Sequence, residues 1–307
     1  MVTGSKGMLG QAIMTELEAD YRLQVVGISR ETCDLRNKSD FADVMRREKP
    51  DLIIHCAAVV GGIQANISNP FEFLSANVEI DSNVINGALD LGTKRLIYVG
   101  SSCMYPKNSQ LLLVEDHLLT GQFEPTNENY ALAKVLGWKL CEAATNSFGV
   151  AYKTIIPSNL YGPGDNFDPK RSHLVASAIH KVHSAKIRGD ESIVVWGSGL
   201  ARREFTYVFD LSRWIYENIL SVENLPPVLN LGYGEDFSVD EFFNFAMKAV
   251  DYSVELEHDD SGPEGMVNKL MDSSLAREKY AWNPMTSVEK GIEETYEWYL
   301  RRGVTFG

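Results

Sequence analysis

Three glycines near the beginning of the chain constrain its fold more than any other feature. Gly4, Gly7 and Gly10 follow a Val2-Thr3 pair and open an amphipathic stretch. Glycines in that order, between a strand and a helix, allow a tight turn and let the backbone approach a pyrophosphate at the positive helix end. Three glycines alone are weak evidence in a chain that has 24 of them. The flanking strand and helix therefore carry the prediction of a dinucleotide site.

Short apolar runs alternate with amphipathic stretches through the first half of the chain. The run at 96–99 is apolar throughout, which is typical of a strand buried on both faces. Repeated strand–helix alternation predicts parallel strands with helices on both faces. We therefore predict an α/β fold built on a Rossmann-like, doubly wound parallel sheet. The predicted helices cover 7–20, 39–48, 71–91 and 127–148, and the predicted strands cover 2–3, 23–28, 51–55, 95–99 and 152–156.

The alternation breaks after about residue 160. Loops rich in Gly, Pro and Asp follow, with short helices between them. The length of 307 residues suits two lobes of about 150 residues each. We expect a dinucleotide-binding Rossmann domain at 1–160 and a smaller, mainly substrate-binding lobe at 161–307. Residues 228–232 have the pattern of a strand that returns to the main sheet.

The charge balance excludes several classes of partner. The chain has 29 basic and 42 acidic residues, a net charge of −13. Such a protein repels nucleic acid and acidic membrane surfaces. No apolar run approaches the roughly 18 residues that span a bilayer, and we expect no targeting segment. Four cysteines without a CxxC spacing argue against a metal site or a disulfide framework. We therefore expect a cytoplasmic protein.

The end of the second predicted strand indicates which dinucleotide binds. An acidic residue there would bind the ribose 2′-hydroxyl of NAD. This chain has Ser29-Arg30 instead, and Lys6 lies inside the glycine loop. Two cations suit the 2′-phosphate of NADP(H), which we predict as the cofactor. Asp34 and Leu35, a few residues later, are candidates for contact with the adenine.

A tyrosine and a lysine one helical turn apart indicate proton transfer. Tyr130 and Lys134 share one face of the helix predicted at 127–148. A lysine ammonium beside a tyrosine lowers the phenol pKa, so we expect Tyr130 to exchange a proton near neutral pH. Ser101 follows the strand at 95–99, at the edge where parallel sheets present catalytic groups.

The glycine loop, Ser101 and the Tyr130-x-x-x-Lys134 pair, in this order, resemble the extended short-chain dehydrogenase/reductase family. Further segments resemble its GDP-L-fucose synthase branch over nearly the whole chain. The segments with Cys103 and His173 are the specific ones, because most sister epimerases and dehydratases lack them. The matching segments are 60–63, 101–107, 125–128, 159–163, 172–173, 196–199 and 203–205.

The resemblance implies an NADPH-dependent 3,5-epimerisation and 4-reduction of GDP-4-keto-6-deoxy-D-mannose to GDP-L-fucose. Cys103 and His173 would be the base and acid of the epimerisations. Tyr130 would give the proton of the reduction, Ser101 would hold the C4 oxygen, and Lys134 would also bind the nicotinamide ribose. We expect a GDP-sugar as substrate and no metal. The implied cofactor residues are Gly4, Lys6, Gly7, Met8, Leu9, Gly10, Arg30, Asp34, Leu35, Ala57, Ala58, Tyr130, Lys134, Pro157, Asn159, Leu160 and His173, and the implied substrate residues are Ser102, Asn159, Lys181, Trp196, Arg203 and Lys269.

Three other functions remain open on the sequence. A GDP-colitose-type synthase shares epimerisation and reduction, and only turnover on defined substrates separates the two. A UDP-sugar 4-epimerase with tightly held NAD is disfavoured by Arg30, Cys103 and His173. A non-catalytic NADP-binding module usually loses the catalytic tyrosine, which is present here. Surplus apolar residues on the helices at 71–91 and 127–148 also predict a homodimer, which pairs these helices in relatives.

Overall fold

The computed structural model describes residues 1–107, 112–169, 171–259 and 269–303. Its centre is a six-stranded parallel sheet with the order β11-β6-β4-β3-β1-β2. The chain passes from β1 to one edge at β2 and returns to β3 on the other side of β1, which makes a topological switch point. The predicted doubly wound α/β class is confirmed. The strands are β1 (Val2–Thr3), β2 (Gly27–Ile28), β3 (Leu52–His55), β4 (Arg95–Val99), β6 (Ala151–Pro157) and β11 (Val228–Leu231).

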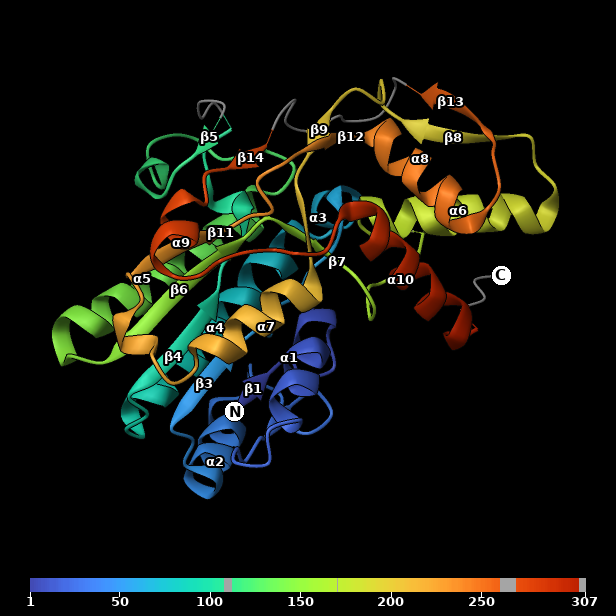
Figure 1. Cartoon of the computed structure of the whole chain (residues 1–307). Coiled ribbons are helices and arrows are strands. Elements are labelled where there is room, and N and C mark those ends of the chain that lie inside the picture. The colour runs from blue at the N-terminus through green and yellow to red at the C-terminus, as the bar shows by residue number, and fades with distance from the viewer. Residues whose placement is uncertain (108–111, 170, 260–268, 304–307) are drawn as a thin grey trace.

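Helices cover both faces of this sheet (Figure 1). On one face, Leu9 and Ile13 of α1 pack in one core with Leu211 and Ile215 of α7. On the other face, apolar residues of α2, α4 and α5 form a second core with the sheet. The helices are α1 (Met8–Glu18) and α7 (Val208–Asn218) on the first face, and α2 (Lys38–Glu48), α4 (Pro70–Asp90) and α5 (Glu128–Phe148) on the second.

One predicted strand is much shorter than expected. We predicted a strand over 23–28, but β2 covers only Gly27–Ile28. Its sole neighbour in the sheet is β1, which has two residues. Residues 23–25 therefore have no strand beside them with which to form a ladder, although the carbonyl of Val26 still accepts a 2.8 Å bond from the amide of Val2.

A second lobe lies above the carboxyl ends of the strands (Figure 1). Its core is rich in aromatic side chains, including Tyr161, Phe205 and Phe242. Within this lobe β7 pairs in parallel with β10, and between the sheet and the lobe β5 pairs in parallel with β14. Its elements are β7 (Asn159–Tyr161), α6 (Leu174–Arg188), β8 (Ser192–Trp196), β9 (Arg202–Arg203), β10 (Phe205–Tyr207), β12 (Phe237–Ser238), α8 (Val239–Val250), β13 (Glu255–Asp259) and α10 (Val288–Arg302).

Short elements complete the described chain. They connect the sheet to the second lobe and place side chains at the carboxyl edge of the sheet. They are α3 (Ile63–Ser68), η1 (Ser102–Met104), β5 (Leu112–Leu113), η2 (Glu115–His117), η3 (Val222–Asn224), β14 (Leu270–Met271) and α9 (Ser274–Lys279).

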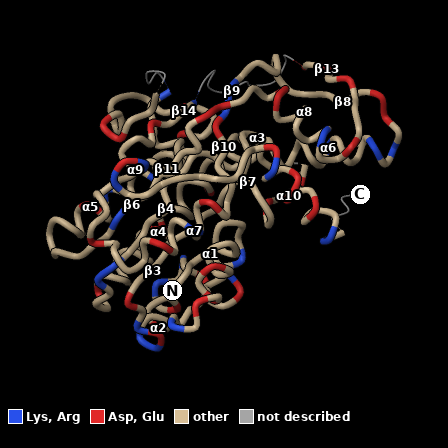
Figure 2. The backbone as a smooth tube through the Cα atoms, viewed as in Figure 1, with Lys and Arg blue, Asp and Glu red and all other residues tan. Residues whose placement is uncertain are grey.

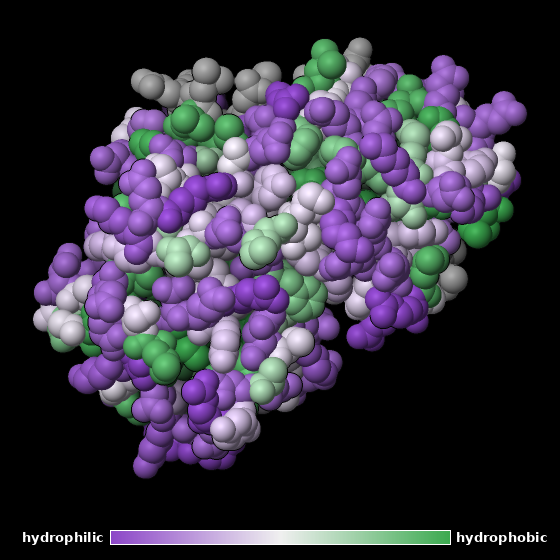
Figure 3. Space-filling view, viewed as in Figure 1, coloured by the Kyte–Doolittle hydropathy of each residue, from purple (hydrophilic) through white to green (hydrophobic). Residues whose placement is uncertain are grey.

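Charges of both signs are interspersed over the surface (Figure 2). The face shown in Figure 3 is mostly hydrophilic, with separate hydrophobic spots. Within the described ranges, none of the helices is both long and apolar enough to cross a membrane. The same ranges contain no cluster of three or more His, Cys, Asp or Glu that could hold a metal ion.

Candidate active site

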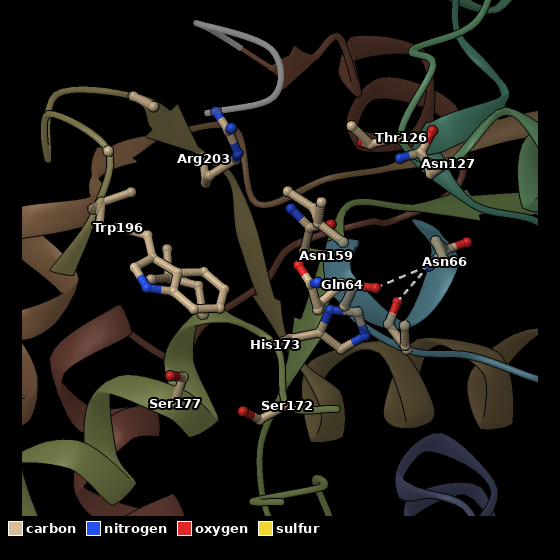
Figure 4. A pocket seen from close by; sticks show the side chains of 18 of the residues that line it. Gln64, Asn66, Thr126, Asn127, Asn159, Ser172, His173, Ser177, Trp196 and Arg203 are labelled. Carbon is tan, nitrogen blue, oxygen red and sulfur yellow. Dashed lines mark hydrogen bonds between the residues drawn. The ribbon is translucent and has the colours of Figure 1, made fainter. Parts of the chain in front are cut away.

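A cavity of about 760 Å³ lies between the carboxyl edge of the sheet and the second lobe. This volume falls within the range of small-molecule sites. Figure 4 shows Trp196 and Arg203 on one side, Thr126 and Asn127 on the other, and His173 between them. The sequence-predicted site residues that line this cavity are Cys103, Asn159, His173, Lys181, Trp196, Arg203 and Lys269.

The glycine loop lies at the switch point of the sheet, between β1 and β3. Gly4 has a φ of +68°, and a Cβ there would lie 2.8 Å from the backbone of Ala57. A Cβ on Gly10 would lie 2.1 Å from the carbonyl oxygen of Gly4. Gly7 begins α1 without a side-chain cap, and the first turn has no acidic residue. No side chain therefore caps the backbone amides at this helix end, and these amides can donate hydrogen bonds to the phosphates of a dinucleotide.

The residues predicted to bind the 2′-phosphate of NADP(H) lie on the surface near this loop. Arg30 is exposed directly after β2. Lys6 is also exposed and forms an ion pair with Glu31, an acid that the sequence did not single out. Asp34 forms a 2.7 Å ion pair with Arg36. The hydrogen bonds from Arg36 lower the pKa of Asp34 to about 2.

Ser101 and Cys103 lie where β4 meets the cavity. The Oγ of Ser101 accepts a 3.3 Å hydrogen bond from the amide of Cys103, which caps η1. Cys103 lines the cavity, whereas the side chain of Ser102 is buried. Burial raises the pKa of the Cys103 thiol, although Lys269, Ser101 and Lys134 oppose this rise. The resting group is therefore a thiol.

Tyr130 lies in the first turn of α5, with Lys134 one turn later. Lys134 is buried, and its Nζ donates a 3.1 Å hydrogen bond to the carbonyl of Val99. Burial raises the pKa of Tyr130 well above its ordinary value, and Cys103 and Asp81 add to this rise. The lowering that we predicted from Lys134 is not found, because excluding water from the phenolate has the larger effect. Tyr130 is thus a neutral phenol, able to donate a proton.

His173 is the residue that precedes α6. It occupies the N-cap position, but its side chain makes no capping bond. Instead the imidazole lies in the cavity, which Gln64 and Asn159 also line (Figure 4). Burial lowers the pKa of His173, so the imidazole is neutral at neutral pH.

Cations gather on the wall that the second lobe contributes. The Nζ of Lys181 donates a 2.8 Å hydrogen bond to the carbonyl of Val194 and lies 5.8 Å from the centre of the Trp196 ring. Trp196 is 59% exposed, so one side of its indole is accessible from the cavity. Arg203 and Lys269 line the same space. With Arg171, which also lines the cavity, these residues make four cations in one cavity of an acidic protein, which suits a phosphate-bearing ligand.

The other predicted residues occupy varied positions. Ala57 and Ala58 follow β3 and are partly buried, whereas Leu35 packs in the core beneath α2. Pro157 ends β6, and Leu160 lies in β7. These positions place all but Leu35 at or near the carboxyl edge of the sheet.

Sequence reasoning missed several polar residues in and around the site. Asp81 is fully buried in α4, within reach of Lys134. Glu204 is buried beside Arg203, within the Arg-Glu-Phe segment that the resemblance had marked. Asn66 and Asn127 line the cavity. The sequence offers one signal that could have identified Asp81, which is its charge between apolar positions of α4.

Comparisons with known proteins agree with this geometry. Residues 1–232 match the model of the NAD dependent epimerase/dehydratase family. The chain belongs to that family. It is 40% identical to a GDP-L-fucose synthase of Azorhizobium caulinodans, over 98% of this chain and 96% of that protein. It is 38% identical to a GDP-L-colitose synthase of Yersinia pseudotuberculosis, over 98% and 97%.

A solved structure extends the comparison to three dimensions. It is a GDP-L-fucose synthetase from Naegleria fowleri bound to NADP, with a TM-score of 0.84 and 27% sequence identity. The alignment covers 98% of this chain and 92% of that one. The chain therefore shares the whole architecture of this protein, both the sheet and the second lobe.

Proposed function

We propose that the protein converts GDP-4-keto-6-deoxy-D-mannose to GDP-L-fucose by two epimerisations, at C3 and C5, and an NADPH-dependent reduction at C4. The observation that carries this proposal is that Cys103 and His173 share one cavity with four cations. The GDP-L-fucose synthases among the relatives support the choice of substrate.

The epimerisations need one base and one acid that reach both carbons. The C4 ketone acidifies the hydrogens at C3 and C5, because the electron pair left behind spreads to the ketone oxygen. In the proposed mechanism the Cys103 thiolate takes the proton from carbon, and the electron pair moves to the C4 oxygen. The protonated His173 returns a proton to the opposite face of the same carbon. The Ser101 hydroxyl holds the C4 oxygen while it carries charge.

The reduction uses a different pair of residues. NADPH, when bound at the glycine loop, would supply the hydride for C4. Tyr130, a neutral phenol by burial, donates the proton to the C4 oxygen. Lys134 lies one turn below Tyr130 and would bind the nicotinamide ribose. The glycine cradle at Gly4 and Gly10 supports a dinucleotide, because a side chain at either position would close it. Arg30 and Lys6 favour NADP(H) over NAD(H).

The nucleotide end of the substrate would lie against the second lobe. Arg203, Lys181 and Lys269 are the cations that we propose for the diphosphate, and Trp196 offers an exposed ring beside them. Asn159 lines the cavity and would border both the nicotinamide and the sugar. Ser102 is the weakest substrate candidate, because its side chain is buried.

A GDP-colitose synthase activity is the second candidate, because a relative with that name matches at 38% identity over nearly the whole chain. The two activities share their epimerisation and reduction chemistry and differ in whether the sugar carries a hydroxyl at C3. With a C3-deoxy substrate, epimerisation is restricted to C5.

We also propose a homodimer through α4 and α5. Leu132 and Leu136 are one turn apart on α5 and are 41% and 39% exposed. Phe71, at the start of α4, is 81% exposed. Exposed apolar residues at helical spacing suit a helix-to-helix contact between two copies. Light scattering at micromolar concentration tests it: the mass of a dimer is expected, and the mass of a monomer would refute the proposal.

The cytoplasm is the location that we propose. Cys33, Cys56, Cys103 and Cys141 are all free thiols. Unpaired cysteines are typical of reducing compartments. Fractionation of cells that produce the protein tests this location, and enrichment in an oxidising compartment would contradict it.

The direct test of the activity supplies NADPH together with one purified sugar nucleotide. GDP-4-keto-6-deoxy-D-mannose is expected to oxidise NADPH and yield a product with the mass of GDP-fucose. Its 3-deoxy counterpart is the matched comparison. A higher kcat/KM for the 3-deoxy sugar would assign the colitose activity instead, and no turnover of either would overturn both.

A further inference from the structure

Cys103 and Lys269 line the same cavity although they are far apart in the sequence. Cys103 lies in η1, directly after the central strand β4. Lys269 lies directly before β14, which pairs with β5. We proposed Lys269 above as one of the cations for the nucleotide diphosphate. Because it shares the cavity with the proposed base, it has access to a second role.

A chain of buried hydrogen bonds connects the two segments. The hydroxyl of Tyr105, two residues after Cys103, donates a 2.7 Å bond to the side-chain oxygen of Asn230. The side-chain Nδ2 of Asn230 donates in turn to the carbonyl of Asp272, at 3.1 Å. The side chain of Asn230 thereby connects the segment that contains Lys269 to the segment that contains Cys103.

The buried carboxyl group of Glu204 also holds the strand β14, which follows Lys269. Glu204 is 1% exposed and accepts a 2.9 Å bond from the amide of Met271, two residues after Lys269. It also accepts a 2.7 Å bond from the amide of Gly234. The backbone just after Lys269 is therefore held at two successive residues, Met271 and Asp272.

The charges of the two groups act on each other. Burial raises the pKa of Cys103, and Lys269 is the foremost of the groups that oppose this rise. Burial lowers the pKa of Lys269, and Cys103 is the foremost of the groups that oppose that fall. Arg203 acts on Lys269 in the same direction as burial, whereas Glu124 and Glu204 act against it.

We propose that Lys269 is the cation that stabilises the Cys103 thiolate, and that Glu204 and Asn230 fix the strand that presents it. Lys269 is then a positioning residue for the base of the epimerisations, in addition to any contact with phosphate. When the thiolate takes a proton from carbon, the negative charge leaves sulfur for the ketone oxygen. The inference rests on the proposed function for its catalytic meaning, but the thiolate itself is measured without substrate.

The test measures the rate at which iodoacetamide alkylates Cys103 as a function of pH, with the modified peptide identified by mass. Lys269→Gln and Lys269→Met remove the charge, and Lys269→Arg restores it. Lys186→Gln is the matched control, because it removes the charge of a lysine that lies outside the cavity. Circular dichroism and NADPH binding show that each variant is folded.

The midpoint of the rate profile is expected to rise by about one pH unit or more in Lys269→Gln and Lys269→Met, a tenfold loss of thiolate. The alkylation rate at neutral pH falls less, about threefold, because a more basic thiolate is more nucleophilic. Lys269→Arg and Lys186→Gln keep the wild-type midpoint. An unchanged midpoint in folded Lys269→Gln or Lys269→Met would overturn the inference. If the midpoint moves but no GDP-sugar is turned over, the thiolate pairing stands and the proposed function fails.

Discussion

The hydroxyl of Tyr98 donates a 2.5 Å hydrogen bond to the buried carboxylate of Asp81. The same carboxylate accepts a 3.0 Å bond from His55 and lies 3.9 Å from the ammonium of Lys134. Because an ionised carboxylate only accepts, Nε2 of His55 carries the proton and Nδ1 accepts from the hydroxyl of Thr3, at 2.7 Å. Asp81 thus links β1, β3, β4 and α5 beneath the proposed site.

Asp81→Asn is expected to lower the free energy of unfolding by about 3–5 kcal/mol, because it leaves the buried Lys134 ammonium without its counter-ion. Tyr98→Phe removes one hydrogen bond and is expected to cost about 1–3 kcal/mol. Urea unfolding at neutral pH measures both. Asp90→Asn, at the exposed end of α4, is the matched control and should stay within about 0.5 kcal/mol of wild type. A loss in Asp81→Asn no larger than in Asp90→Asn would contradict this account.

The opposite pKa shifts of Cys103 and His173 predict the pH dependence of epimerisation. The active form needs a thiolate and an imidazolium, and burial disfavours both. Between the lowered pKa of His173 and the raised pKa of Cys103, each unit of pH increases the thiolate tenfold and decreases the imidazolium tenfold. The exchange of substrate hydrogen with heavy water is therefore expected to be flat across neutral pH, and to fall only below the lowered pKa of His173 and above the raised pKa of Cys103.

His173→Gln tests the assignment of this plateau. Without the imidazolium, the residual exchange depends on the thiolate alone and should rise tenfold per unit of pH through the neutral range. The same variant should be slower than wild type throughout. A plateau that persists in His173→Gln would show that another group is the acid.

Arg30→Ala is expected to weaken NADPH binding about tenfold or more, because a charge-assisted bond to phosphate contributes about 1.5–3 kcal/mol. Binding of NADH, which lacks the 2′-phosphate, should change little. Fluorescence titration of both nucleotides measures the two effects. Arg22→Ala, at an exposed arginine paired with Asp20, is the control. Equal affinities of the wild type for NADPH and NADH would contradict the predicted preference.

Asp165 is expected to make the protein less stable as pH rises. Burial raises the pKa of Asp165 to about 7, from 3.8 in the unfolded chain. The folded state therefore binds more protons between these values, and the free energy of unfolding falls as pH rises from about 4 to 7. Asp165→Asn should remove about 2–4 kcal/mol of the fall between pH 4 and 8. Urea unfolding at both pH values measures it, and an equal fall in the variant would contradict the assignment. A smaller fall should remain from Glu204, whose pKa burial raises to about 7.

Much of the fold could be predicted because it depends on local patterns. Leu9, Ile13 and Leu17 follow helical spacing, and all three are buried. The run at 96–99 is buried at every position, as its continuous apolar character predicts. The length of β2 was wrongly predicted from its own apolar run at 23–28, because that run does not indicate that a two-residue β1 limits the ladder.

The candidate site could be predicted only in part, because its electrostatics depend on contacts between distant segments. The spacing of Tyr130 and Lys134 correctly placed both on α5. It could not indicate that burial would raise the pKa of Tyr130. Nor could it indicate that Asp81, on another helix, would lie beside Lys134.

The separation of epimerisation from reduction tests the central claim most directly. The measurement follows deuterium from heavy water into C3 and C5 of GDP-4-keto-6-deoxy-D-mannose, together with NADPH oxidation, in Cys103→Ser and Tyr130→Phe. The account predicts that Cys103→Ser loses exchange at both carbons but keeps its NADPH affinity, whereas Tyr130→Phe keeps exchange and loses NADPH oxidation. Full exchange at both carbons in Cys103→Ser would contradict the account and leave Cys103 as a packing residue.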